Sequence, residues 1–204
     1  MNSSRGASSG EFKLSRSHAM RITGGMIKGC RLARIKGTNI RPTSDMVRSS
    51  IFNILGQALN GCIALDLFAG TGSLGIESLS RGSEKAVFID KSKKALTLIK
   101  KNLSICGYEE RAIVAREGLP DGLARIHDLG CDKFDLVFID PPYGKGYIAP
   151  TLSNLVDEGL LARDSRVVVE SSTGTDDELP AKVGDLVLNL TRAYGSTLLG
   201  IYLY

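Results

Sequence analysis

The sequence predicts an α/β fold: a mostly parallel sheet of seven strands, with helices on both faces and an antiparallel C-terminal edge. From residue 62 to residue 170, short apolar runs alternate with helical patterns, as in chains whose helices cover both faces of a parallel sheet. The pattern changes after Pro180, where two strand-like runs flank Tyr194-Gly195. The 204 residues, 43% of them hydrophobic, suffice for one such domain and a short extension.

The individual elements follow in chain order. Ser44 or Thr43 can cap a helix that ends at Gly56, because the residues between them place their apolar side chains on one face. Further helices are expected near residues 73–81, 92–106, 121–129 and 148–158. Strands are expected near residues 62–67, 85–90, 111–115, 134–139, 165–170, 183–193 and 196–204.

The chain divides into three parts. Residues 1–20 are rich in serine and glycine, and Glu11-Phe12-Lys13-Leu14 resembles translated restriction sites. We therefore expect a vector-derived tail outside the fold, with Met20 as the natural start. Residues 21–58 are expected to form a basic extension, a hairpin followed by the first helix. Residues 59–204 are expected to form the main domain.

Charge is distributed unevenly along the chain. Residues 1–48 hold ten Lys and Arg against two acids, a net of +8, and the rest of the chain carries −4 of the overall +4. A basic arm on a mildly acidic body indicates an anionic partner, with nucleic acid the first choice. A solvated basic tail explains the same composition equally well.

Composition excludes several classes of protein. No apolar stretch reaches the ~20 residues of a membrane span, and the N-terminus lacks the apolar core of a signal peptide. The four cysteines are widely spaced without a CxxC pair, and there are two histidines. These features predict a cytoplasmic protein with reduced thiols and no metal site.

The most informative motif is Asp140-Pro141-Pro142-Tyr143, which follows an apolar strand-like run. Two prolines fix φ and remove two N–H donors, so the loop is rigid. A carboxylate, a backbone carbonyl and an aromatic ring are thereby held at the end of a strand. This set suits a planar substrate with an amino group, whose two N–H bonds need acceptors. In the plainer alternative, the aspartate caps the next helix and the tyrosine packs on the surface.

A glycine-rich loop joins the first predicted strand of the main domain to its helix. Its Gly70-x-Gly72-x-x-Gly75 spacing matches the dinucleotide fingerprint, a weak signal alone. Asp66 argues against a dinucleotide, because a carboxylate beside this loop would repel a pyrophosphate and would suit a cationic or amine-bearing ligand. Asp90 ends the second strand, where a carboxylate can hold ribose hydroxyls. Both acids can instead be helix caps.

Glu117-Gly118 closes the third strand of the main domain. Its position in such folds would allow Glu117 to contact the adenine of a ligand. An acid on a surface loop, without a role in binding, explains the same residue equally well.

Taken together, these motifs resemble class I methyltransferases that use S-adenosylmethionine. Asp66 to Gly75 resembles their first motif, and Asp140 to Tyr143 resembles the (Asp/Asn)-Pro-Pro-(Tyr/Phe) motif of amino-group methylation. The segments Arg21–Gly25, Arg41–Arg48, Ile51–Asn53, Leu74–Gly82 and Tyr194–Thr197 narrow the resemblance to the bacterial 16S ribosomal RNA guanine-N2 methyltransferases.

The resemblance implies a Rossmann-like fold, a methyl donor and a set of functional residues. The implied catalytic residues are Asp140, Pro141 and Tyr143. The implied cofactor-binding residues are Asp66, Phe68, Ala69, Gly70, Gly72, Asp90, Lys91, Glu117 and Gly118. The implied RNA-binding residues are Arg21, Arg41, Thr43 and Arg48. The implied partner is ribosomal RNA or the assembling 30S subunit. The protein is expected to be a monomer that binds neither a membrane nor a metal.

Three other functions compete with this interpretation. A DNA adenine or cytosine amino-methyltransferase shares the tetrapeptide, but the chain has no evident target-recognition domain. A nicotinamide-dependent oxidoreductase would use the glycine loop, but Asp66 and the lack of a hydride-relay residue count against it. A non-catalytic RNA-binding scaffold is the third alternative, disfavoured because every expected catalytic position is present.

Overall fold

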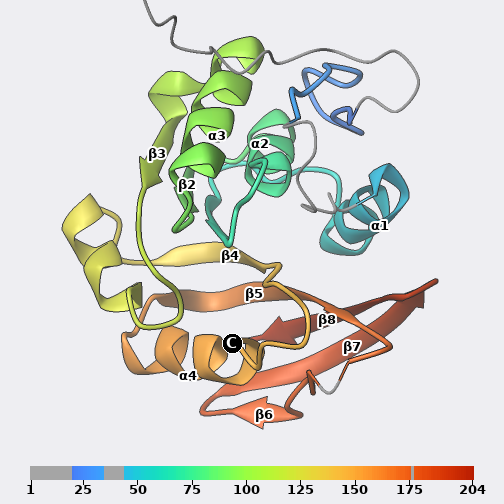
Figure 1. Ribbon diagram of the computed structural model, residues 1–204, viewed down its shortest axis with the longest axis vertical. Coiled ribbons are helices and arrows are strands. Elements are labelled where there is room, and N and C mark those ends of the chain that lie inside the picture. Colours follow the sequence, from blue (N-terminus) through green and yellow to red (C-terminus); the bar gives the residue numbers. More distant parts are fainter. Residues whose placement is uncertain (1–19, 35–43, 176) are drawn as a thin grey trace, which may run out of the picture.

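The computed structural model describes residues 20–34, 44–175 and 177–204, and folds them around one sheet with helices on both faces (Figure 1). The predicted tail, apart from Met20, and the predicted RNA-binding residues Arg41 and Thr43 lie outside the described residues. The described α-helices are α1 (Asp45–Leu55), α2 (Ser73–Ser80), α3 (Lys93–Cys106) and α4 (Ile148–Asp157). Two short 3-10 helices are η1 (Glu109–Arg111) and η2 (Leu123–Leu129), the second within the segment predicted as a helix over 121–129.

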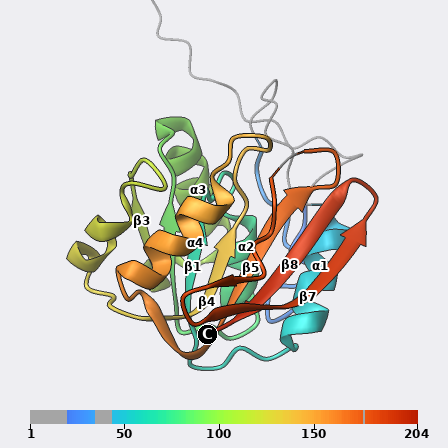
Figure 2. The ribbon, with the colours of Figure 1, turned by 90° about the horizontal axis from the view of Figure 1, so that it is seen from below.

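The sheet has eight strands where the sequence predicted seven. They are β1 (Ile63–Leu67), β2 (Lys85–Ile89), β3 (Ala112–Ala115), β4 (Phe134–Ile139), β5 (Leu161–Ser172), β6 (Lys182–Val183), β7 (Leu186–Tyr194) and β8 (Thr197–Leu203). Their order is β3-β2-β1-β4-β5-β8-β7-β6 (Figure 2). The additional strand is β6, whose two residues are too few to produce an alternating pattern.

The sheet is parallel from β3 to β5 and antiparallel beyond, as expected for this edge. Side chains alternate between its faces, so each parallel strand serves two cores. Phe88 and Phe138 point to the face covered by α1, α2 and α3, whereas Val87 and Val137 point to the face covered by η2 and α4. This two-sided burial explains why the strands appear in the sequence as continuous apolar runs.

The N-terminal extension folds back on the first of these cores. Residues 20–34 form a short antiparallel turn with a bridge between Arg21 and Arg31. Ile22 and Leu32 are buried in the core with α1 and α2. Met20 is 4% exposed and its carbonyl accepts a hydrogen bond from the Leu32 N–H at 2.9 Å. Residue 20, the boundary of the expected tail, therefore packs with the extension, because its side chain fills part of the core.

A buried carboxylate on α2 fixes the extension and α1 in place. Glu77 is fully buried and accepts hydrogen bonds from the backbone N–H of Thr23 at 2.8 and 3.0 Å and from its hydroxyl at 2.7 Å. It also pairs with Arg48 at 3.2 Å and with Arg81 at 2.9 Å. Three segments far apart in sequence therefore meet at one carboxylate.

Arg48 is not the phosphate ligand that the resemblance implied. Its side chain is fully buried, between Glu77 and Asp45, whose oxygens lie 3.2 and 2.7 Å from its nitrogens. A guanidinium held this way is already neutralised and shielded from a large polyanion. In the structure, its role is to bind α1 to α2.

We expect Glu77→Gln to destabilise the protein by about 3–5 kcal/mol, because it leaves two buried guanidinium groups without their shared carboxylate. The free energy of unfolding from urea titration measures the effect. Asp164→Asn is the matched control: it makes the same carboxylate-to-amide change in an ion pair whose side chains are 95% and 90% exposed, and Asn tolerates the positive φ of 60° at this position. Equal unfolding midpoints for Glu77→Gln and wild type would contradict a structural role for the buried ion pairs.

Candidate active site

The candidate site lies where the strand order reverses. From β1 the chain proceeds outward to β2 and β3, whereas β4 and β5 lie on the other side of β1. In open α/β sheets, ligands bind at such a switch point, beyond the carboxyl ends of the strands. Asp66 lies near the end of β1, Asp90 directly follows β2, and Asp140 directly follows β4. The topology therefore brings together the acids that the sequence singled out.

The glycine loop requires its glycines for two different reasons. Gly70 and Gly72 have φ of 53° and 76°, values that a residue with a Cβ adopts at a cost. Gly75 is needed for packing, because a Cβ there would lie 2.3 Å from the ring of Phe88. Phe68 also has a positive φ, 58°, so the strand-to-helix connection bends sharply on both sides of Ala69.

Asp90 clamps this loop to the start of α3. One carboxylate oxygen accepts a hydrogen bond from the Gly70 N–H at 2.9 Å, and the other accepts one from the Ser92 N–H at 2.8 Å. Each oxygen keeps a further lone pair for a ligand hydroxyl. Asp90 thus shapes the loop as well as facing the cavity.

Asp66 is buried beneath the same loop. It is 2% exposed and accepts the backbone N–H of Gly75 at 2.9 Å. Burial raises the pKa of this carboxyl to about 8, and the neighbouring charge of Asp90 adds to the rise, whereas the hydrogen bond from Gly75 opposes it. A cationic group entering the cavity would favour the ionised form.

A cavity of about 580 Å³ opens beside these acids, within the ~300–1,000 Å³ typical of small-molecule sites. Ten of the predicted residues line it: Asp66, Phe68, Ala69, Gly70, Asp90, Lys91, Glu117, Asp140, Pro141 and Tyr143. Gly72 and Gly118 are not among its lining residues. The cavity is also lined by Thr71, Ser73, Leu74, Ser92, Ala95, Leu119 and Pro142, which were not among the implied catalytic or cofactor-binding residues.

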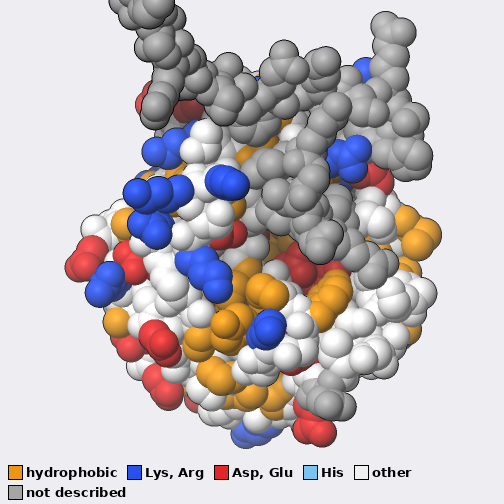
Figure 3. Space-filling view, viewed as in Figure 1, with side chains coloured by type: hydrophobic (Ala, Val, Ile, Leu, Met, Phe, Trp, Pro, Cys, Tyr) orange, Lys and Arg blue, Asp and Glu red, His pale blue; other side chains and the backbone are white. Residues whose placement is uncertain are grey.

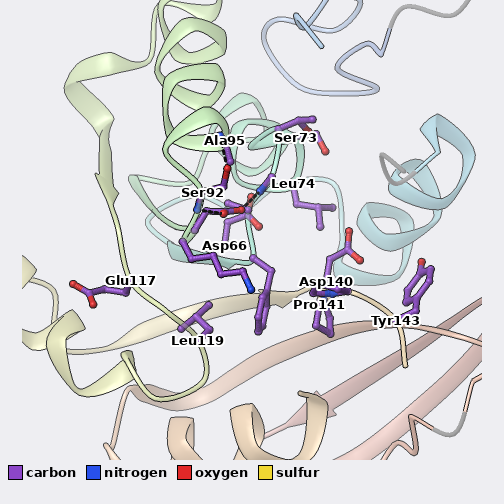
Figure 4. A pocket seen from close by; sticks show the side chains of 17 residues that line it. Asp66, Ser73, Leu74, Ser92, Ala95, Glu117, Leu119, Asp140, Pro141 and Tyr143 are labelled. Carbon is purple, nitrogen blue, oxygen red and sulfur yellow. Dashed lines mark hydrogen bonds between the residues drawn. The ribbon is translucent and has the colours of Figure 1, made fainter. Parts of the chain in front are cut away.

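Glu117 lines the cavity but is engaged elsewhere. Its carboxylate lies 3.2 Å from a guanidinium nitrogen of Arg125, and Figure 4 shows it directed away from the other labelled side chains. The charge of Glu117 is therefore paired with Arg125 and not directed toward the other labelled side chains of the cavity.

Asp140 and Pro141 stand at the end of β4, facing the same cavity as Asp66 and Leu74 (Figure 4). Tyr143 follows at the edge of this group. Its hydroxyl donates to Glu170 on β5 at 2.8 Å, and Glu170 is 5% exposed. The ring of the tyrosine is consequently fixed by a neighbouring strand.

Two further contacts hold the loop that follows Tyr143. Asp177 accepts the backbone N–H of Gly146 at 2.9 Å and also that of Gly144. Tyr147 stacks on Phe68 with ring centroids 5.8 Å apart and planes 13° apart. Sequence reasoning missed Glu170, Asp177 and Tyr147; the signal available for Glu170 was an acid ending the apolar run of β5.

The predicted RNA-binding residues fare differently. Arg21 is exposed on the extension, with 59% of its side chain accessible and Asp45 at 4.0 Å. Arg48 is buried as described above. The two remaining residues, at positions 41 and 43, lie outside the described residues.

Two negative findings apply to the part of the chain that the structure describes. It contains no group of three or more His, Cys, Asp or Glu side chains placed to hold a metal ion. None of its helices is long and apolar enough to cross a membrane.

In the absence of ligand, we expect wild type to lose stability relative to Asp66→Asn as the pH rises. The raised pKa means that the folded state holds a proton which the unfolded state has lost, so the contribution of Asp66 to stability is complete below pH 3.8 and declines as pH rises toward about 8. Asparagine carries no such proton. Urea titrations at pH 5, 6, 7 and 8 should show the variant gaining on wild type by up to about 1.4 kcal/mol per pH unit, whereas a constant difference would place the group in water.

Comparison with known proteins identifies the family. A family model described as Conserved hypothetical protein 95 matches residues 20–203. YlbH of Bacillus subtilis, provisionally named an rRNA methyltransferase, is 39% identical over 185 residues, which cover 90% of this chain and 98% of YlbH. Ribosomal RNA small subunit methyltransferase D of Escherichia coli is 29% identical over 191 residues, covering 90% and 89%.

A solved structure agrees with these matches. The Escherichia coli protein yhhF, provisionally described as a methyltransferase, superposes with a TM-score of 0.74 at 30% identity and covers 90% of this chain and 97% of its own. The fold is that of class I methyltransferases. The chain belongs to the Conserved hypothetical protein 95 family, the family of the small-subunit 16S ribosomal RNA methyltransferases.

Proposed function

We propose that this protein transfers a methyl group from S-adenosylmethionine to the exocyclic N2 amine of a guanine in the 16S ribosomal RNA of the small subunit. We expect it to act as a monomer in the cytoplasm, on naked RNA or on the assembling 30S particle. The relatives support ribosomal RNA as the substrate class. The guanine N2 position rests on the chemistry of the site and on the resemblance of its motifs.

One observation carries the proposal: Asp140 and Pro141 line the same cavity as Asp66 and Gly70. An amine acceptor pair and a loop suited to a small cationic ligand are thus combined in one space. A nicotinamide enzyme does not need a pair of acceptors for an amine. The buried carboxylate of Asp66 would also repel a pyrophosphate bound beside the glycine loop.

The residues present fit S-adenosylmethionine. The buried Asp66 suits the ammonium group of the ligand, the free lone pairs of Asp90 suit ribose hydroxyls, and the side chains of Leu74, Ala95 and Leu119 suit a purine ring. When bound, the ligand supplies a methyl group on a positively charged sulfur, which is already an activated leaving group. No metal is required for such a transfer.

The chain's own residues then address the weak nucleophile. The lone pair of the guanine N2 is delocalised into the ring. The amine becomes reactive when this lone pair is turned out of conjugation. In our proposal, Asp140 Oδ and the Pro141 carbonyl accept the two N–H bonds and direct the lone pair toward the methyl group. Positioning supplies most of the acceleration. Asp140 receives the departing proton directly or through water.

Tyr143 provides the wall of the base pocket. An aromatic ring fixed by Glu170 offers a flat surface on which a base flipped out of its helix can stack. A sequence-specific DNA enzyme would require further recognition elements, and the relatives act on RNA by name. A scaffold without turnover would have no need of the acceptor pair.

We expect Asp140→Ala to lower methyl transfer at least a hundredfold while the affinity for S-adenosylmethionine changes no more than a few-fold. The substitution removes an acceptor and the proton's destination but leaves the glycine loop intact. Transfer of a radiolabelled methyl group to 16S rRNA and isothermal titration with the cofactor measure the two quantities.

The control for this experiment is Asp157→Ala, an exposed carboxylate on α4, which should match wild type in both assays. Mass spectrometry of the digested product then identifies the nucleoside. A methyl group on any atom other than guanine N2 would refute the proposed acceptor, and equal loss of binding and transfer in Asp140→Ala would refute the catalytic role.

A further inference from the structure

Helix α3 presents an unbalanced basic surface. Its 14 residues include Lys93, Lys94, Lys100 and Lys101 and no acidic residue. Lys93, Lys94 and Lys100 are exposed, and no described carboxylate lies within 4.0 Å of their side-chain nitrogens. Lys93 and Lys100 are seven residues apart, two turns of the helix, so they lie on the same stripe about 10 Å from each other.

The position of two of these lysines is unfavourable for the helix itself. Lys93 and Lys94 occupy the first turn, where the positive end of the helix dipole repels a cation. Asp90 is the acid at this end, and both its oxygens already accept the backbone N–H groups of Gly70 and Ser92. Interaction with the helix dipole therefore does not account for Lys93 and Lys94.

Helix α3 adjoins the cavity at its start and contacts the basic extension through its buried face. Ser92 and Ala95, at the start of α3, line the cavity. Further along the helix, Asn102 is fully buried on the face opposite Lys93 and Lys100, and it accepts the backbone N–H of Ala33 in the extension at 2.7 Å. Figure 3 shows several Lys and Arg side chains at the upper left, in the part of the molecule where Figure 1 places α3 and β3.

We infer that the exposed lysines of α3 form a phosphate-binding surface for the RNA substrate, beginning next to the cavity. The inference rests on the proposed function and extends it, since α3 was not among the predicted RNA-binding segments. Phosphate oxygens spaced along a backbone are complementary to a stripe of ammonium groups, and such contacts position the RNA without specifying its sequence. The location beside the cavity allows RNA held on α3 to present a nucleotide to Asp140.

The test is the double variant Lys93→Glu/Lys100→Glu. This change should leave α3 folded, because an acid at position 93 suits the helix dipole and position 100 is exposed. We expect RNA affinity at low salt to fall at least tenfold. The slope of log affinity against log salt should fall by about 2, one for each phosphate that a lysine no longer neutralises. Fluorescence anisotropy with a 16S rRNA transcript, and with 30S particles lacking the modification, provides the affinities.

The matched control is Arg163→Glu/Lys182→Glu, which makes the same change in charge on β5 and β6, at exposed positions away from α3. It should bind RNA close to wild type. Cofactor affinity should be unchanged in both variants.

Three outcomes would overturn the inference: wild-type affinity and salt slope in the α3 variant, an equal loss in the control, or a loss with particles but not with transcript, which would place a protein against α3. Each leaves the proposed function standing if wild-type enzyme methylates 16S rRNA. Failure of that methylation refutes the function itself, independently of the variants.

Discussion

The arrangement of the site depends on one buried carboxylate. Glu77 lies on α2, which begins directly after the glycine loop, and it holds Thr23 of the extension and Arg48 of α1 against that helix. A carboxylate removed from water is stable only if its oxygens are fully hydrogen-bonded and its charge is matched. Here both conditions are met by groups from three segments. The glycine loop beside the cavity and the basic extension consequently share one rigid support.

The sequence predicted the sheet and the strand-end acids well because these depend on local patterns. Apolar runs and glycine spacing identified β1, β4 and the loop between Asp66 and Gly75, and topology then brought their ends together. Arg48 was misassigned because an arginine in a basic segment looks the same whether it meets phosphate or a buried acid. Its partner Glu77 is 29 residues away, and only the fold places them 3.2 Å apart.

The contacts around Tyr143 escaped the sequence for the same reason. Glu170 and Asp177 belong to β5 and the segment after it, and they act on a loop that follows β4. The prolines restrict the backbone of residues 140–142, but this restriction does not by itself determine the orientation of the side chains. The hydrogen bond from Tyr143 to Glu170, the two backbone N–H groups on Asp177 and the stacking of Tyr147 on Phe68 determine the direction of the loop. The last contact also connects the acceptor loop directly to the cofactor loop.

Acids outnumber cations around the cavity, whose described lining residues include four acids and one lysine, Lys91. The acids Asp66, Asp90 and Asp140 surround the cavity, where a cationic donor and a neutral amine would meet them. The lysines of α3 and the arginines of the extension lie outside it, where a polyanion would approach. Were the two sets mixed, phosphate would compete for the cavity and carboxylates would repel the RNA. In the proposed function, this distribution of charge would let a polyanionic substrate dock outside the cavity while a single base enters the mainly acidic interior.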